Sequence, residues 1–520
     1  MLSFLKQVFS SNNTENQSNN INNANNKPKT PISNNLKINK DYIKSNLNNS
    51  FDLIIREIPS PNSYKEKAIL IYIGELSDKS LLEKVLLPKI ASVASINGSE
   101  EELLNAVKYI FAFQDKDILI DFETTIDTIF SGTPVMLIDG IGKSFSIHIK
   151  NPPARNVEEP NSEQVIRGPR EGFTESITVN VSLIRKRLNN PNLTMELFNL
   201  GQETKTNVVI SYISNIASMK IVNEIKNKLA SLKLESMLGS NYIEESIIDN
   251  PPSLFPLVFH TEKPDVASAK LLEGRILLLV DGSPVVLSMP TLFIEFMQSG
   301  EDYYTSYFSA TLKRIIRYIS LLITLTLPST YVSLTTFHQE LIPTKLVITI
   351  IQSRSSTPLP ALAEVTLMLL VYEIMREAGI RMPKTLGQAV SIVGTLVIGE
   401  SAVRAGLVGT PTVIIVSLTA ISLFSLPSLE LHSPITYMRF LLLILSGMLG
   451  FIGMICGVLF LVTNLVAKRS FGVPYMFPLC PFNLTSQEDV LVRAPINRLS
   501  KNKKTLKSNG RFISWKIHKS

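Results

Sequence analysis

The chain has 520 residues, a length typical of about three domains, and only 18% of them are charged, below the usual ~25%. Cys456 and Cys480 are the two cysteines, which excludes a disulfide scaffold and a multi-cysteine metal site, and the five histidines show no metal-ligand spacing. The net charge of +7 comes from residues 468–520, a basic tail with eleven Lys or Arg against two Asp or Glu; since it follows an apolar run, we expect membrane lipid and no nucleic acid as its partner.

The first fifty residues have the composition of a disordered N-terminal segment. The apolar stretch in MLSFLKQVFSSNN is too short for a signal peptide, so we expect residues 1–310 to stay in the cytoplasm. Residues 11–50 contain fifteen Asn in forty positions, and such a tract buries too little apolar surface to offset its ordering entropy. We therefore predict a disordered, Asn-rich leader over 1–50.

Residues 51–150 have the pattern of an α/β subdomain. A buried strand is expected over 67–76 and a helix over 99–111, with Ser99 as N-cap and Glu102 at the capping-box position. Two strands around Asp139-Gly140 are expected over 134–149.

A second copy of this pattern ends at 273–290, where two apolar strands flank Asp281-Gly282. Between the copies we expect helices over 174–188 and 218–232, and strands near 194–199 and 206–213. Residues 174–310 are thus a second α/β subdomain, related to the first by duplication unless the two Asp-Gly hairpins merely share a common turn.

The linker 151–173 is polar and rich in proline, and it ends in Gly168, Pro169, Arg170, Glu171, Gly172 and Phe173. Thr174 is expected to cap the following helix, whose N-terminus could hold an anion. The composition favours a structural hinge at an interface over a ligand site.

Residues 311–467 are expected to form an α-helical, multi-pass transmembrane domain. Apolar segments cover 318–337, 360–375, 385–406, 410–427 and 440–467. Five crossings would place the N-terminal domain and the basic tail on opposite sides, although both are expected in the cytoplasm. Either 360–375 does not cross, or 345–352 contributes to a sixth crossing.

Two of these segments carry charged residues. Glu364 and Glu373 within 360–375 either face a partner or water inside the membrane, or lie on an interfacial helix with both acids in solvent. Glu400 precedes Arg404 by four residues, which favours an ion pair.

The segment 385–406 places small and weakly polar residues on one helical face, among them Gln388, Ser391, Thr395 and Gly399. This face suits either close helix packing or, in a symmetric ring, the lining of a hydrated pore.

We find no enzyme motif. DGIGKS (139–144) lacks the first glycine of a P-loop, since that position is Leu137, and nucleophile-elbow, zinc-protease and dinucleotide motifs are missing from the sequence. We expect no catalysis, no cofactor and no metal. The classes of protein that the sequence leaves open are a channel, a secondary transporter and a membrane receptor.

The stretches RGPREGFTES (167–176), LIRKRL (183–188), VDGSP (280–284), LTTFHQELIPTKL (334–346), REAGIRMPKTLGQAVSIVGTLVIGESAV (376–403) and RSFGVPYMFPL (469–479) together resemble the GerA family. Specifically, residues 50–500 resemble the A subunit of spore germinant receptors. In that family Gly168–Phe173 corresponds to a signature without an agreed chemical role.

The resemblance implies a protein of the spore inner membrane that works with B and C subunits. It implies two α/β subdomains, a nutrient held by the B subunit, and A subunits that assemble into a ring forming a nutrient-gated cation channel. A receptor that does not conduct, or a secondary transporter, is the alternative.

Overall fold

The structure, a computed structural model, describes residues 30–46, 50–59, 66–96, 99–149, 159–160, 163, 165–248, 253–381, 399–482 and 489–495. It divides into two compact units, Met1–Pro153 with Asn189–Pro191, and Ala154–Leu188 with Asn192–Ser520. The boundary falls within the expected linker, and the second α/β subdomain shares its unit with the helical region.

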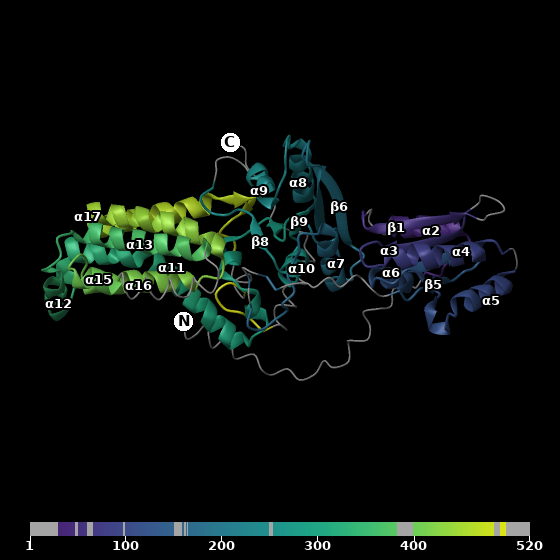
Figure 1. Cartoon of the computed structure of the whole chain (residues 1–520), viewed down its shortest axis with the longest axis horizontal. Helices are drawn as coiled ribbons and strands as arrows, with labels where there is room; N and C mark the ends of the chain where they lie inside the picture. Colours follow the sequence, from purple (N-terminus) through teal and green to yellow (C-terminus); the bar gives the residue numbers. More distant parts are fainter. Residues whose placement is uncertain are drawn as a thin grey trace. The chain divides into compact units, whose positions relative to one another are not determined.

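The first unit is built on an antiparallel five-stranded sheet of order β1-β2-β4-β5-β3 (Figure 1). Its strands are β1 (Leu53–Pro59), β2 (Glu66–Ile73), β3 (Ile118–Leu119), β4 (Val135–Ile138) and β5 (Ser144–Ser146). Its helices are α2 (Leu36–Asn46), α3 (Lys79–Leu81), η1 (Leu82–Leu86), α4 (Leu87–Ala94), α5 (Glu100–Phe111), η2 (Asp115–Asp117) and α6 (Phe122–Phe130). The capping box of Ser99 and Glu102 at the start of α5 is confirmed.

Helices cover both faces of this sheet, and successive side chains of a strand point to opposite faces. On β2, Leu70 and Tyr72 pack with α4 and α5, whereas Ile69 and Ile71 pack with α2 and α6. The strand therefore reads as a continuous apolar run.

The prediction of a disordered leader over 1–50 is wrong for residues 30–46, which fold into the first unit; residues 1–29 lie outside the described residues. Leu36 and Ile43 of α2 are buried against the sheet, and Ile32 joins the same cluster. These apolar side chains supply one helical face, which also carries the buried Asn39, whereas Lys37 and Lys44 are exposed.

The second unit contains a sheet of identical order, β6-β7-β9-β10-β8, again antiparallel throughout. Its strands are β6 (Leu193–Leu200), β7 (Thr206–Ile213), β8 (Phe259–Thr261), β9 (Ile276–Val280) and β10 (Val286–Met289). Helices α8 (Met219–Ser231) and α9 (Ser240–Ile247) cover one face, and α7 (Ile177–Arg187) and α10 (Pro264–Leu272) cover the other.

The same hydrogen bonds occur within each of the two subdomains. The Asn39 side chain accepts from the backbone N–H of Ser33 (2.9 Å) and donates to its carbonyl (2.6 Å). Asn180 does the same with Thr174, at 2.8 and 2.6 Å. In each copy the aspartate of the Asp-Gly turn accepts from the first backbone N–H of α2 or α7, and the following glycine donates to the same loop.

The helical region follows two short 3-10 helices, η3 (Phe293–Met297) and η4 (Gly300–Tyr303). Its helices are α11 (Tyr307–Thr336), η5 (Gln339–Leu341), α12 (Thr344–Arg354), α13 (Ala361–Arg381), α15 (Gly399–Arg404), α16 (Thr410–Phe424), η7 (Leu429–Leu431) and α17 (His432–Ala467). By length and composition, two stretches among the described residues could cross a membrane, Tyr307–Thr336 and Leu429–Ala467. Of the other expected segments, 410–427 forms the shorter helix α16, and 360–375 lies in α13, which carries four acidic or basic residues besides its ends. Most of the segment 385–406 lies outside the described residues.

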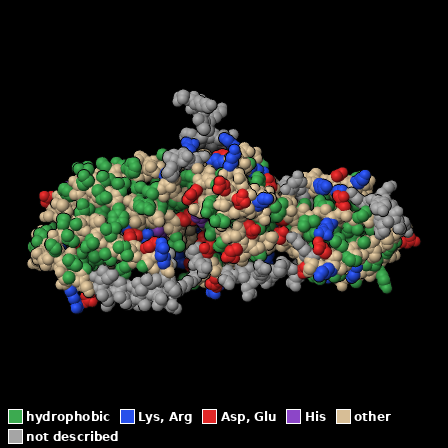
Figure 2. Space-filling model, turned by 45° about the horizontal axis from the view of Figure 1, so that its top comes forward, with side chains coloured by type: hydrophobic (Ala, Val, Ile, Leu, Met, Phe, Trp, Pro, Cys, Tyr) green, Lys and Arg blue, Asp and Glu red, His purple; other side chains and the backbone are tan. Residues whose placement is uncertain are grey.

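Apolar side chains gather on the outside of this region (Figure 2). On α11, α16 and α17 they include Ile319, Leu322, Ile414, Ile421, Ile452 and Ile455, all half-exposed or more. The same helices bury hydroxyl groups, among them Ser333 and Ser446, which lie 2.6 Å apart. An apolar exterior around polar contacts is the arrangement expected in lipid.

Helix α17 is a hairpin of two antiparallel helices joined at Gly450. This residue has φ +64° and ψ −142°, a conformation that only glycine adopts readily. A Cβ at Gly453 would lie 2.1 Å from the carbonyl oxygen of Leu445, and one at Gly457 would lie 2.5 Å from Leu442. The glycines therefore let the two halves pack closely, and the expected single span 440–467 belongs to a segment that turns back.

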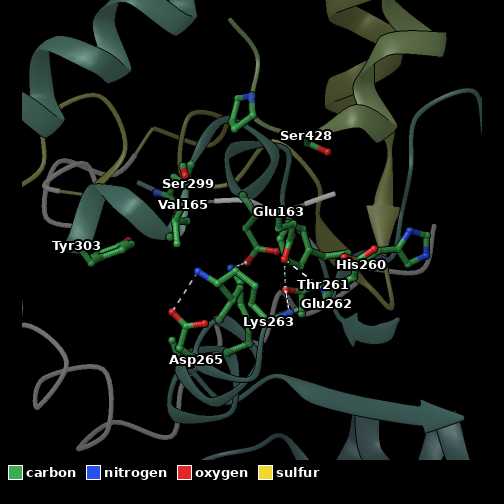
Figure 3. A pocket seen from close by; sticks show the side chains of 18 of the residues that line it. Glu163, Val165, His260, Thr261, Glu262, Lys263, Asp265, Ser299, Tyr303 and Ser428 are labelled. Carbon is green, nitrogen blue, oxygen red and sulfur yellow. Dashed lines mark hydrogen bonds and ion pairs between the residues drawn. The ribbon is translucent and has the colours of Figure 1, made fainter. Parts of the chain in front are cut away.

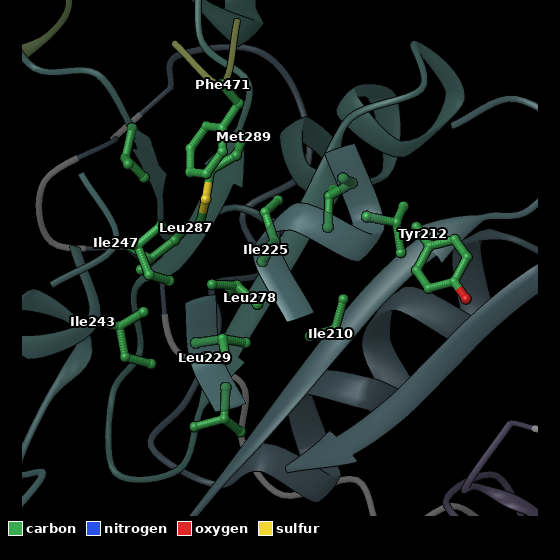
Figure 4. Close-up of a cluster of buried hydrophobic side chains, with 14 of the residues drawn as sticks. Ile210, Tyr212, Ile225, Leu229, Ile243, Ile247, Leu278, Leu287, Met289 and Phe471 are labelled. Carbon is green, nitrogen blue, oxygen red and sulfur yellow. The ribbon is translucent and has the colours of Figure 1, made fainter. Parts of the chain in front are cut away.

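The chain after α17 returns to the second sheet. Strands β11 (Arg469–Ser470) and β12 (Val473–Pro474) pair there, and Ser470 Oγ accepts from Thr291 N (3.0 Å). Phe471 inserts beside Met289 in the hydrophobic core (Figure 4). Both ends of the helical region therefore lie beside the second sheet.

Candidate functional site

The segment Gly168–Phe173 packs within the second unit. Gly168 has φ +138°, and a Cβ there would lie 2.9 Å from the Tyr304 ring, so any other residue would meet both strain and a clash. Phe173 is buried with α7, and its backbone N–H donates to the Glu262 carbonyl (2.7 Å). The segment thus touches the chain that leads into α11.

Its charged residues form ion pairs. Glu171 pairs with Arg187 at 2.6 Å, and Arg170 pairs with Glu159 at 3.1 Å. Both partners of the Arg170 pair are exposed, and such pairs stabilise a protein by about 0–1 kcal/mol. Helix α7 begins at Ile177, after Ser176, so Thr174 is not its N-cap. The backbone N–H of Thr174 instead donates a hydrogen bond to the Asn180 side chain.

Glu364 is fully buried at the end of the bundle distant from the sheet. It forms an ion pair with Arg354 (3.4 Å) and accepts a hydrogen bond from the backbone N–H of Gly409. The interpretation with this acid in solvent is therefore wrong.

Glu373 lies in the middle of α13. Its carboxylate pairs with Arg376 at 2.8 Å and with the buried Arg439 of α17. Removing one partner of a buried pair leaves an uncompensated charge, so these contacts fix how α13 sits against α17.

The face that the sequence predicted to line a pore is described at one end only. Gln388, Ser391 and Thr395 lie outside the described residues. Gly399 begins α15, and a Cβ there would approach Val413 to 4.0 Å, an ordinary contact. Glu400 and Arg404 form the expected ion pair at 2.5 Å, and both side chains are exposed.

A buried charge network that the sequence did not predict joins η4, α11 and residues 489–495. Asp302 accepts from Arg317 at 2.7 and 2.9 Å and from Arg314 at 3.1 Å. Arg314 also donates to the Asp489 carboxylate at 2.9 Å. No local pattern in the sequence indicated that Asp302 or Asp489 lies opposite these arginines.

His260 forms a second link between the sheet and the helices. Its Nε2 lies 2.8 Å from Glu244 of α9, and its Nδ1 lies 2.9 Å from Glu430 of η7. Burial lowers the pKa of the imidazole, but hydrogen bonds to the two carboxylates outweigh this and raise its pKa to about 10. Within the described residues, no three His, Cys, Asp or Glu side chains form a group that could hold a metal ion.

Residues 41–505 match the family described as Bacillus/Clostridium GerA spore germination protein. Similar proteins include spore germination protein KA of Bacillus subtilis, 39% identical over 89% of this chain and 85% of that protein. Spore germination protein GerLA of Bacillus cereus is 35% identical over 92% of this chain and 96% of that protein. A crystal structure of the N-terminal domain of the A subunit of the Bacillus megaterium spore germinant receptor GerK3 aligns with 51% of this chain and 99% of that one, at 29% identity and a TM-score of 0.39.

Proposed function

Because the chain belongs to the GerA family of spore germination proteins, we propose that it is the A subunit of a nutrient germinant receptor and forms an oligomeric, nutrient-gated cation channel. The observation that carries this proposal is the match to the family over residues 41–505, which includes both subdomains and the helical region.

A membrane location is supported by the helices. The apolar exterior of α11, α16 and α17 has no other covering among the described residues, and lipid would cover it at no cost. In the proposed arrangement the receptor lies in the spore inner membrane with its sheets on the cytoplasmic side, together with residues 468–482.

The pore is assigned to the face of Gln388, Ser391, Thr395 and Gly399. Copies of this face in a ring would approach closely through small side chains and would present hydroxyl and amide groups to hydrated cations. The B and C subunits complete the receptor, and the B subunit holds the nutrient.

Ion flux tests the assignment. The A, B and C subunits are reconstituted together in liposomes and exposed to nutrient, with the variants Ser391→Arg and Thr395→Arg beside the wild type. A positive ring adds a barrier to cations, and each ~1.4 kcal/mol reduces the flux about tenfold. Ser355→Arg, an exposed position at the end of α12, is the matched control and should conduct normally.

The other outcomes identify the alternatives. Nutrient-dependent structural change without any ion flux would replace the channel by a receptor that does not conduct. Saturable flux of the nutrient itself would identify a secondary transporter. Unchanged flux in both variants would remove the pore assignment.

A further inference from the structure

Two arginines share one carboxylate where α13 packs on α17. Arg376 of α13 lies 2.8 Å from Glu373, and Arg439 of α17 pairs with the other oxygen of the same carboxylate. By contrast, the buried Lys263 beside the second sheet has a carboxylate of its own, that of Asp265 at 3.6 Å (Figure 3). Among the described residues, the cluster on α13 and α17 therefore holds two positive charges against one negative charge. An unbalanced charge in a buried place is costly.

Several donors of these two guanidinium groups are not used. Each arginine reaches Glu373 through its Nη2 atom, whereas the Nε and Nη1 atoms of both are buried without a hydrogen-bond partner in the described part of the chain. The Arg439 side chain is fully buried, and Arg376 is 17% exposed, so the cluster reaches the surface at Arg376. Buried donors are normally paired, and the planar fork of a guanidinium matches the oxygens of a phosphate. The two arginines therefore favour an anionic acceptor between α13 and α17.

Two further polar groups accompany the arginines. The Tyr372 hydroxyl and the His432 Nε2 atom are also buried without a hydrogen-bond partner among the residues that the structure describes. Tyr372 lies one turn before Arg376 on α13, and His432 lies two turns before Arg439 on α17. Each helix thus brings one aromatic polar group and one arginine to the same side.

The place of the cluster indicates which anion fits. Helix α17 begins at His432, directly after the loop in which Glu430 pairs with His260, so Arg439 lies about 10 Å from the helix end beside the second sheet. The same two helices expose Ile374 and Tyr437 at this level. The headgroup layer of a bilayer is about 5–8 Å deep on each side of the hydrocarbon core, and tyrosines are enriched there. In the proposed orientation the arginines therefore lie near the phosphates of the cytoplasmic leaflet.

We propose that Arg376 and Arg439 bind the phosphate of an anionic phospholipid. Basic sites between helices at this side of a membrane bind lipid headgroups, and the acyl chains would follow the apolar exterior of the same helices, which includes Leu370 and Ile444. The inference rests on the membrane location proposed above but not on ion conduction. A chain that binds this lipid and carries no current would leave the inference standing and remove the channel.

Three probes separate the headgroup from the rest of the lipid. They are dioleoyl phosphatidylglycerol, dioleoylglycerol, which has the same acyl chains without a phosphate, and inorganic phosphate. Native mass spectrometry of the full-length protein in detergent counts the molecules bound to each copy. Phosphatidylglycerol should bind saturably, and the other two about tenfold more weakly or worse, because one lacks the charged hydrogen bonds and the other the apolar contacts.

Variants locate the site. Arg376→Gln removes the excess charge and keeps the pair of Arg439 with Glu373, so it should weaken binding of phosphatidylglycerol by about tenfold. Arg381→Gln is the matched control, because Arg381 lies in the last turn of the same helix but is exposed, and it should bind the lipid normally. Glu373→Gln removes the competing carboxylate and should strengthen binding, a change that a purely structural cluster would not produce.

Three results would overturn the proposal, with circular dichroism to check that each variant is folded. Equal weakening by Arg376→Gln and Arg381→Gln would mean that the lipid is attracted by surface charge alone. Inorganic phosphate that binds as tightly as phosphatidylglycerol would make the ligand a free anion. If no probe binds the folded chain, lipid is not the acceptor, and an acidic side chain of another subunit takes its place.

Discussion

Asn180 and Asn39 perform the same task in the two subdomains. Each is buried, and each uses its amide to bond both backbone groups of one residue before a helix. The Asn amide offers an acceptor oxygen and a donor nitrogen on separate atoms, so it can bond both backbone groups at once and fix the loop that enters α2 or α7.

Replacing Asn180 by Ala should therefore destabilise the second unit by about 1–3 kcal/mol, because the N–H and carbonyl of Thr174 lose their partners in a buried place. Thermal unfolding in nanodiscs measures the change. Asn241→Ala removes an exposed amide from α9 and should stay within about 0.5 kcal/mol. Equal effects of the two substitutions would contradict the role of Asn180.

His260 should make the second unit sensitive to pH. Its pKa is raised from 6.5 to about 10 by Glu244 and Glu430, so its contribution is fully present below the unfolded value and is lost as the pH rises through about 10. The melting temperature should fall between about pH 7 and pH 10, and His260→Gln should reduce this slope. His148→Gln, at an exposed site, should leave it unchanged. The same slope in both variants would show that other groups are responsible.

At the scale of elements, the hairpin of α17 places both ends of this helical segment beside the second sheet. Glu430 before the helix pairs with His260, and Ser470 after it bonds Thr291, so both ends are held by the second sheet. The turn at Gly450 lies against Phe337, the C-terminal end of α11. The first half of α17 therefore runs away from the second sheet, and the second half returns to it.

Cysteine labelling checks this arrangement. In a chain with Cys456→Ser and Cys480→Ser, single cysteines replace Leu429, Leu449 or Arg469, all of them exposed. A membrane-impermeant maleimide should label positions 429 and 469 from the same side of sealed vesicles and position 449 from the other. Labelling of 429 and 469 from opposite sides would mean that α17 crosses once.

The sequence predicted elements better than it predicted their turns. Period-two and helical patterns located β2, β6, β7 and α8 to within a few residues, because one face of each is buried. It could not select Gly450 as the turn, since Gly447, Gly453 and Gly457 occur in the same apolar run. Helix α2 was missed because its few apolar residues lie in an Asn-rich tract.

In the candidate site, too, the sequence predicted local contacts but not contacts between distant segments. The Glu400–Arg404 pair follows from helical spacing alone, and it is present. The partners of Glu364 and Glu373 lie on other helices, at Arg354 and Arg439, which no local pattern relates to them. Contacts between distant segments depend on the topology, and the topology depends on the unpredicted turn.

For the whole molecule, the network around Asp302 links three distant parts of the chain. Asp302 belongs to the segment after the second sheet, Arg314 and Arg317 to α11, and Asp489 to the chain after α17. We therefore expect a movement of the sheet to be felt at both ends of the helical region through these contacts.

Asp302→Asn should break this link. Arg317 would lose its charged partner in a buried place, at a cost of about 3–5 kcal/mol. Glu301→Gln is the matched control, because the neighbouring Glu301–Lys313 pair (2.9 Å) is partly exposed and contributes about 0–1 kcal/mol. Hydrogen exchange should increase in the first turns of α11 and in residues 489–495 for Asp302→Asn alone. If both variants exchange alike, or if only α11 responds, the network does not connect the two ends of the helical region, and coupling must instead run through His260 or the core around Phe471.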